Sequence, residues 1–304
     1  MKDPIIISVG GGKGGVGKST ITANIGTTLC QKGFSVGFID ADLGGANLHL
    51  CLGLRRPKRG LQDFIKGTFK NLNDVAIPTI VAKSWLISGA SDILELANPN
   101  FAQKQKIINN LRKMEADFIL VDLGAGSSYH VTDFFAAFPN GIIVTDGLPT
   151  SIENAYGYLK NGILRGMVRL FTGNPTLQSI IRNFTDPESK NGFITVNDLL
   201  NFLKNNYPNE VTVLTEWLHN RRSFLILNMV KSADDIKIGT RFAEMVKKYL
   251  SINLYYIGYI LNAPEIRTSI KEMRPFMLNE EPSKTRECFE AVTQNLISIS
   301  GELT

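Results

Sequence analysis

The feature that most constrains the fold is a glycine-rich loop near the amino terminus, Gly12 to Thr20, which reads Gly-Lys-Gly-Gly-Val-Gly-Lys-Ser-Thr. From Gly12 to Ser19 the spacing fits the phosphate-binding pattern G-x-x-x-x-G-K-[ST]. The loop follows an apolar run, Ile5–Val9, and precedes a helical pattern from Ile21 to Cys30, the two elements that such a loop connects. Glycines let backbone N–H groups curve around a phosphate, and the helix adds the positive end of its dipole. The sequence therefore predicts a nucleotide-phosphate site.

Two side chains of the loop have expected roles in that site. We expect Lys18 to reach the β and γ phosphates and the Ser19 hydroxyl to ligate Mg²⁺, which bridges the same phosphates. The candidate nucleotide-binding residues of the loop are Gly12, Lys13, Gly14, Gly15, Val16, Gly17, Lys18, Ser19 and Thr20.

Short apolar runs alternate with helical patterns along the chain, which favours an α/β fold with a mainly parallel sheet and helices on both faces. We expect one domain over residues 1–304, with a helical insertion at 166–222, where turn-like sequences interrupt the alternation. The carboxyl ends of parallel strands form the ligand crevice of such a sheet. The expected strands are Ile5–Val9, Ser35–Ile39, Trp85–Ser88, Asp117–Val121, Gly141–Val144, Phe224–Leu227 and Leu254–Ile260.

A second lysine, Lys13, lies five residues before Lys18. With it the chain resembles the MinD/ParA family of deviant P-loop ATPases, which is similar in turn to nitrogenase iron protein. In that family the extra lysine crosses a dimer interface to the partner's ATP. The resemblance thus implies ATP and ADP as ligands, an ATP-dependent homodimer and a catalytic role for both lysines. A cation supplied by the partner stabilises transition-state charge, as an arginine finger does.

Acidic residues follow two of the expected strands. Asp40 and Asp42 come after Ser35–Ile39, in a stretch similar to the family's first switch, and Asp122 follows Phe118–Val121 before a Gly-Ala-Gly turn typical of a Walker B strand and second switch. The resemblance implies that Asp42 orients the attacking water and that Asp122 holds Mg²⁺. Asp42 and Asp122 are therefore candidate catalytic residues and, with Ser19, candidate metal ligands. Each acid could instead cap the following loop or helix.

Base recognition rests on the resemblance alone. An asparagine after a late strand reads adenine in this family, and Asn228 follows Phe224–Leu227. An amide suits an adenine edge because it both donates and accepts hydrogen bonds. Pro264, in the turn Asn262-Ala263-Pro264-Glu265, matches the other wall of the adenine site.

Within the family, Asp40–Gly53, Trp85–Gly89, Pro149–Ile152 and Arg274-Pro275-Phe276 are most similar to the FlhG-like branch that regulates flagellar number. The cysteines, Cys30, Cys51 and Cys288, are isolated, which disfavours an iron–sulfur carrier.

The sequence leaves location and partners open. We expect a cytoplasmic protein, because no apolar run approaches the roughly 20 residues that cross a bilayer. Peripheral membrane association stays an alternative. The apolar stripe of the carboxyl-terminal helix has few flanking cations, and we expect that helix to dock on the core. Ile163–Phe171 is a better candidate for a basic amphipathic helix. The net charge is +5, and the strongest basic cluster is Arg55–Arg59, which we expect to be a solvated loop.

Three functions remain in view. The leading hypothesis is a Mg²⁺-dependent ATPase, slow by itself and stimulated by a protein partner, whose ATP-bound dimer positions or regulates a division site or flagellum. The alternatives are a partition-type ATPase that binds DNA nonspecifically and a nucleotide-holding scaffold with negligible turnover. Partition-type binding predicts retention on DNA that falls steeply with salt.

Overall fold

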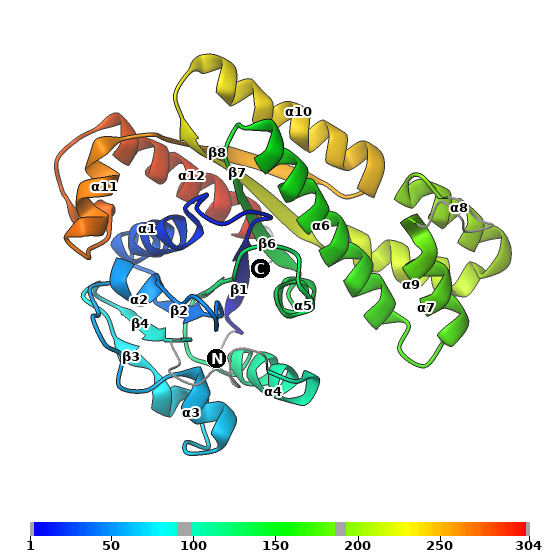
Figure 1. Ribbon diagram of the computed structural model, residues 1–304, viewed down its shortest axis with the longest axis horizontal. Coiled ribbons are helices and arrows are strands. Elements are labelled where there is room, and N and C mark those ends of the chain that lie inside the picture. The colour runs from blue at the N-terminus through cyan, green and yellow to red at the C-terminus, as the bar shows by residue number, and fades with distance from the viewer. Residues whose placement is uncertain (1–2, 90–98, 186–192, 302–304) are drawn as a thin grey trace.

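The computed structural model describes residues 3–89, 99–185 and 193–301. Within these residues the strands form one eight-stranded sheet in the order β3-β4-β2-β5-β1-β6-β7-β8 (Figure 1). All neighbouring pairs are parallel except β3 with β4. The strands are β1 (Ile5–Gly10), β2 (Val36–Asp40), β3 (Ile77–Pro78), β4 (Ser84–Ile87), β5 (Phe118–Asp122), β6 (Asn140–Thr145), β7 (Arg222–Val230) and β8 (Leu254–Leu261).

Helices cover both faces of the sheet. The alternation of side chains along a strand divides the core into two layers: Ile6 of β1 packs on one side, and Ile7 and Val9 pack on the other. Helices α1 and α12 cover the face that Ile7 meets, and α4, α5, α6 and α10 cover the opposite face. The α/β fold with a mainly parallel sheet is therefore confirmed.

The helices vary in length from a single turn to six turns. They are α1 (Lys18–Gln31), α2 (Leu48–Cys51), α3 (Leu61–Lys66), α4 (Phe101–Leu111), α5 (Tyr129–Ala137), α6 (Pro149–Leu170), α7 (Pro175–Arg182), α8 (Val196–Asn206), α9 (Pro208–His219), α10 (Ala233–Leu250), α11 (Pro264–Lys271) and α12 (Lys284–Gly301), with the 3₁₀ turns η1 (Leu72–Val75), η3 (Asn183–Thr185) and η4 (Phe276–Leu278).

Each of the seven expected strands is present, six of them within one residue of the expected bounds, whereas β7 extends two residues before and three residues beyond the expected Phe224–Leu227. The sequence did not indicate β3, because an antiparallel strand of two residues that ends in a proline leaves no apolar run to detect.

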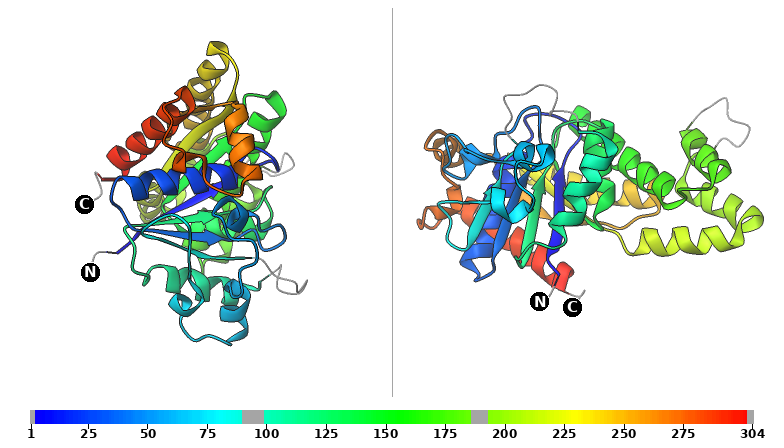
Figure 2. Two further views of the ribbon diagram at one scale, coloured as in Figure 1. Left: turned by 90° about the vertical axis from the view of Figure 1, so that its left-hand side faces the viewer. Right: turned by 90° about the horizontal axis from the view of Figure 1, so that it is seen from below.

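The stretch 166–222 begins inside α6, which continues to Leu170. Gly166 itself lies inside α6 where α9 packs against it: a Cβ on Gly166 would come within 2.3 Å of the Trp217 ring. Its lack of a side chain permits that close contact. Helices α7, α8 and α9 follow, and Figure 2 (right) shows them projecting beyond the end of the sheet.

Two amphipathic stretches pack on the body of the protein. The buried face of α12 contributes Phe289, Val292 and Leu296 to the core beside β8 and α1. The apolar side of α6 contributes Ile163 and Met167 to the opposite layer. Across the residues that the structure describes, no helix has the length and apolar character needed to span a membrane.

Candidate functional site

The candidate site lies where the carboxyl ends of β1, β2, β5 and β6 meet. The strand register places Asp122, the last residue of β5, beside Val9 of β1 and Asp40 of β2. The loop after β1 enters α1, and the loop after β6 enters α6. Four connections from distant parts of the sequence therefore converge at one edge of the sheet, where open α/β sheets bind ligands.

Gly17 and Gly12 are two positions of the glycine-rich loop at which the structure requires glycine. Gly17 has a φ of 89°, in the left-handed region, and a Cβ there would lie 2.4 Å from the side-chain nitrogen of Asn228. Gly12 passes so close to α6 that a Cβ would lie 1.9 Å from the carbonyl oxygen of Asn154. Larger residues would displace β7 or α6. The loop is thus held between these two elements, with Gly17 preceding the first turn of α1.

The two lysines of the loop have different surroundings. Lys18 begins α1 and is only 8% exposed. Burial lowers the pKa of Lys18, while the charges of Asp122 and Asp42 oppose this effect. Lys13 is half-buried, and its Nζ lies 3.5 Å from Oγ of Ser151, in the first turn of α6. Lys18 therefore sits inside the site of its own chain, and Lys13 lies at its margin.

Asp122 is fully buried beside Lys18. Burial raises the pKa of Asp122 to about 6, although hydrogen bonds from Ser19 and Thr22 and the charge of Lys18 act in the opposite direction. Oγ1 of Thr22 lies 3.3 Å from Oδ1 of Asp122. The carboxyl group is thus held in place by Ser19 and Thr22, and its burial outweighs the favourable charge of Lys18.

The two acids after β2 are used differently. Asp40 is buried and accepts hydrogen bonds from the backbone N–H groups of Asp42 and Leu48, so it shapes the loop and the start of α2. Burial and the neighbouring charge of Asp122 raise the pKa of Asp40 well above its usual value. The Asp42 side chain turns toward the loop after β5, where a Cβ on Gly124 would lie 3.1 Å from its Oδ1. Asp42 therefore lies between the two loops that the sequence likens to switches.

A cavity of about 200 Å³ opens beside Asp42, between these loops. Its other described lining residues are Ala41, Leu43, Gly44, Pro99, Gly124, Ala125, Ser128, His130, Val131 and Phe134.

On the opposite side of the loop, Asn228 is buried near the carboxyl end of β7. Its side-chain nitrogen donates to the carbonyl oxygen of Val16 at 2.8 Å, so the amide ties β7 to the glycine-rich loop. A cavity of about 100 Å³ adjoins it, lined by Asn262 and Ala263 and by Ile266, Arg267 and Ile270 of α11. Pro264 is the first residue of α11 and starts that helix at the cavity wall. The expected adenine residues are thus brought together, with one donor of Asn228 already engaged.

The oxygen donors present are chemically suited to Mg²⁺. The Ser19 hydroxyl adjoins the Asp122 carboxylate, and Mg²⁺ commonly takes one or two protein ligands together with substrate phosphates and water. A cluster of three or more His, Cys, Asp or Glu side chains arranged for a metal does not occur within residues 3–89, 99–185 and 193–301. The site therefore fits a cation that arrives with phosphates better than one held in an all-protein cage.

Sequence reasoning missed two residues of the site. Thr22 supports Asp122 from the inner face of α1, and its Oγ1 also lies 2.9 Å from the carbonyl oxygen of Lys18. Tyr158 of α6 lies beneath Gly10, where a Cβ would come within 2.0 Å of its hydroxyl oxygen. A threonine one turn after a P-loop serine was a usable signal, whereas the Tyr158 contact depends on how α6 crosses β1.

The CobQ/CobB/MinD/ParA nucleotide-binding domain model matches residues 7–295, almost the entire chain. The chain belongs to this family. Its membership confirms the resemblance inferred from the loop, and the matched domain is a nucleotide-binding one.

Two curated family members carry names linked to flagella or to gene control. The chain is 36% identical over 157 residues to the antiactivator FleN of Pseudomonas aeruginosa, covering 51% of this chain and 55% of that protein. It is 37% identical over 161 residues to the flagellum site-determining protein YlxH of Helicobacter pylori, covering 51% and 52%. The matches thus span about half the length of these relatives.

Solved MinD structures share the fold of this family member. Pyrococcus horikoshii MinD complexed with Mg-ADP aligns with a TM-score of 0.65 and 22% identity, covering 98% of each chain. MinD in the MinC:MinD cell division complex of Aquifex aeolicus aligns with a TM-score of 0.63 and 21% identity, covering 96% of this chain and 95% of that one. At these identities the likeness concerns the fold.

Proposed function

We propose that the protein is a Mg²⁺-dependent ATPase that dimerises when ATP is bound and returns to the monomer after hydrolysis. The observation that carries the proposal is the convergence of Lys18, Ser19, Asp42 and Asp122 at one edge of the sheet, with Lys13 at its margin. Membership of a nucleotide-binding family and the Mg-ADP found in a MinD of the same fold support it.

Each side chain has a place in the proposed chemistry. Backbone N–H groups of the loop and the amino end of α1 surround the phosphates, and Lys18 neutralises their charge. Ser19 and Asp122, the latter through water, would hold Mg²⁺, which would supply further positive charge at the phosphates. Asp42 accepts a hydrogen bond from the attacking water and orients it toward the γ phosphate.

Lys13 provides the link between hydrolysis and assembly. Its ammonium group lies at the edge of its own site, where its hydrogen bond to Ser151 is long, 3.5 Å, and therefore costs little free energy to break. In a dimer, Lys13 would reach the phosphates bound by the partner and stabilise the charge that develops during transfer. ATP then favours the dimer because its γ phosphate supplies the charge that Lys13 meets.

We further propose that this switch regulates the number or placement of a cellular structure, and we favour a flagellum over a division site. We also propose that a protein partner stimulates its ATP hydrolysis. The names of FleN and YlxH, together with the MinC:MinD complex of a structural relative, support this assignment.

Light scattering coupled to size exclusion tests the assembly step. Asp42→Ala should bind ATP without hydrolysing it and accumulate as a dimer in ATP but not in ADP. Asp42→Ala combined with Lys13→Ala should stay monomeric. Lys70→Ala, which removes an exposed lysine near α3, is the matched control in the same background and should dimerise normally.

Phosphate release from ATP tests the chemical step. The unaltered protein should release phosphate slowly, and Lys18→Ala should release none. Persistence of the monomer at high protein and ATP concentration would exclude the dimer switch. Tight nucleotide binding with no turnover, even with candidate partners added, would favour the scaffold instead.

A further inference from the structure

A second cavity, of about 330 Å³, lies between α5, α6 and α7, away from the glycine-rich loop. Its volume falls in the range of small-molecule pockets, about 300–1,000 Å³. It is lined by Ser127, Tyr129, Thr132, Asn161, Leu164, Arg165, Val168, Ile181 and Arg182. None of these described lining residues is acidic.

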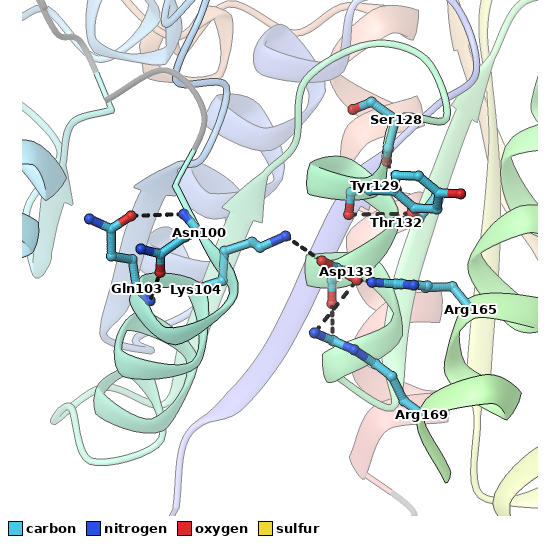
Figure 3. A network of polar contacts seen from close by, with 9 residues as sticks. All are labelled: Asn100, Gln103, Lys104, Ser128, Tyr129, Thr132, Asp133, Arg165 and Arg169. Atoms are coloured by element: carbon cyan, nitrogen blue, oxygen red, sulfur yellow. Dashed lines mark hydrogen bonds and ion pairs between the residues drawn. The ribbon is translucent and has the colours of Figure 1, made fainter. Parts of the chain in front are cut away.

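The wall of this cavity belongs to a network with an excess of positive charge. Asp133 of α5 is fully buried and pairs with Lys104 of α4 and with Arg165 and Arg169 of α6 (Figure 3). Nε of Arg165 lies 2.7 Å from Oδ1 of Asp133, and Nη2 of Arg169 lies 3.5 Å from the same oxygen. Three cations thus share one carboxylate. Of these, Arg165 lines the cavity, and Arg182 of α7 is the second cation among its described lining residues.

The charges around Asp133 act in opposite directions on its pKa. Burial raises the pKa of Asp133, but hydrogen bonds from Arg165 and Lys104 and the charge of Arg169 outweigh this and hold it below its usual value. The carboxyl group is therefore ionised at neutral pH. Even so, its single negative charge balances only one of the three positive charges that pair with it.

The guanidinium groups are placed to meet an anion. Arg165 is held by Asp133 and stacks over the Tyr129 ring, 5.0 Å from its centroid, while its side chain is still 29% exposed. Arg182 has one long contact, 3.5 Å from Nη2 to Oε1 of Gln178. The Arg165 guanidinium, held by Asp133, and the Arg182 guanidinium, with its one long contact among the described residues, suit a carboxylate or a phosphate, both of which accept paired N–H donors.

The rest of the lining suits an organic ligand rather than a bare ion. Leu164, Val168 and Ile181 provide an apolar surface, and the Tyr129 ring, on a residue that is 73% exposed, stands at the cavity. An apolar surface with a few convergent polar groups is the usual composition of a small-molecule pocket.

The cavity is also connected to the proposed nucleotide site. Ser127 belongs to the turn that follows Asp122, and Tyr129 begins the helix to which that turn leads. At the other end of α5, the buried Arg221 donates to the carbonyl oxygens of Phe135 and Ala136. Because α5 is fixed at its far end, a ligand at its near end would act on the turn rather than shift the whole helix.

We propose that this cavity binds a small organic anion, a carboxylate or phosphate joined to an apolar group, and that its occupancy alters the loop between Asp122 and Ser128. The regulatory half of this inference rests on the proposed nucleotide function, whereas the binding half does not.

Calorimetric titration of the full chain saturated with Mg²⁺-ADP tests the binding, because the nucleotide then blocks the glycine-rich loop. The probes are phenyl phosphate and benzoate, with benzyl alcohol as the neutral control. We expect one site for at least one of the two anions and no binding of the alcohol. Preference between the two anions identifies the ligand as a phosphate ester or a carboxylate.

Three variants locate the site. Arg182→Gln, at an exposed position that should not disturb folding, should weaken binding about tenfold or more, the loss expected for one charged hydrogen bond. Asn161→Trp, which keeps every charge but fills the cavity from α6, should abolish binding. Arg241→Gln, an exposed arginine on α10, should leave binding unchanged.

The regulatory half is read from the release rate of a fluorescent ADP, which a saturating probe should change in the unaltered protein but not in Asn161→Trp. Any of three results would overturn the proposed site. These are no binding of either anion, an equal loss of binding affinity in Arg182→Gln and Arg241→Gln, and undiminished binding in Asn161→Trp. Binding without any change in release would overturn the coupling alone. Failure of hydrolysis, by contrast, would leave the calorimetric result intact.

Discussion

Asp122→Asn should stabilise the nucleotide-free protein while weakening its hold on Mg²⁺. Burial raises the pKa of Asp122 to about 6 from an ordinary value near 3.8, so ionisation of this group disfavours the folded state. A shift of about two units corresponds to about 3 kcal/mol. Asparagine keeps the shape and an oxygen that accepts from Thr22, but it removes the charge.

The sign follows from proton linkage. A raised folded-state pKa means that the folded protein binds the proton more tightly, so the contribution of Asp122 to stability is largest at low pH and is lost as pH rises through about 6. Asp122→Asn should therefore be more stable than the unaltered protein by about 3 kcal/mol at pH 7.5 and by about 1 kcal/mol at pH 4.5.

Urea unfolding in EDTA, followed by circular dichroism at both pH values, measures this difference. Asp74→Asn changes an exposed carboxylate in η1 and is the matched control, with an expected effect within about 0.5 kcal/mol. Addition of Mg²⁺-ADP should reverse the order, because the unaltered site gains a cation that the variant holds poorly. If Asp122→Asn is the less stable protein at pH 7.5 in EDTA, the reasoning about this carboxylate is wrong.

Further substitutions test the loop and the cationic network. Gly17→Ala should lower the free energy of unfolding by about 1–3 kcal/mol and abolish binding of a fluorescent ADP. The reason is that the φ of residue 17 is positive and the new Cβ meets Asn228. Unchanged binding would contradict the loop geometry. Asp133→Ala should lower the free energy of unfolding, measured in urea, by about 3–5 kcal/mol, because the substitution leaves neighbouring cations without their buried carboxylate. A loss below about 1 kcal/mol would show that the network is dispensable. Since the pKa of Asp133 is held low, its contribution should be present at neutral pH and disappear on acidification, seen as convergence of Asp133→Ala with the unaltered protein at low pH.

Much of the fold could be predicted because its strands are buried on both faces and therefore appear as continuous apolar runs. Four of these runs, those of β1, β2, β5 and β6, end at loops that meet at the site, so the order of runs and polar turns indicated both the sheet and the edge at which Lys18 and Asp122 meet. The glycine-rich loop was informative for a related reason: its φ angles and its closeness to α6 leave few residues that can occupy it.

The features that escaped prediction depend on long-range packing. The sequence offered the stripe from Ile163 to Phe171 only as a candidate basic amphipathic surface, and it did not indicate that Arg165 and Arg169 turn toward Asp133, more than 30 residues earlier in the chain. Asn228 was assigned to adenine, and the structure adds a hydrogen bond to Val16 that no local pattern could indicate. In each case the partner lies on another element, so spacing within one segment carries no signal.

The most direct test of the central claim mixes two inactive variants and measures phosphate release. Lys13→Ala keeps a complete site but cannot supply the lysine to its partner, and Asp42→Ala supplies the lysine but cannot position the water. Each alone should release phosphate at least about tenfold more slowly than the unaltered protein, in line with the large effect of a cation supplied in trans. Mixed in ATP, the two should form dimers with one working site and recover a substantial part of the activity. Normal hydrolysis by Lys13→Ala alone, or a mixture that forms dimers yet stays as inactive as its components, would contradict the account.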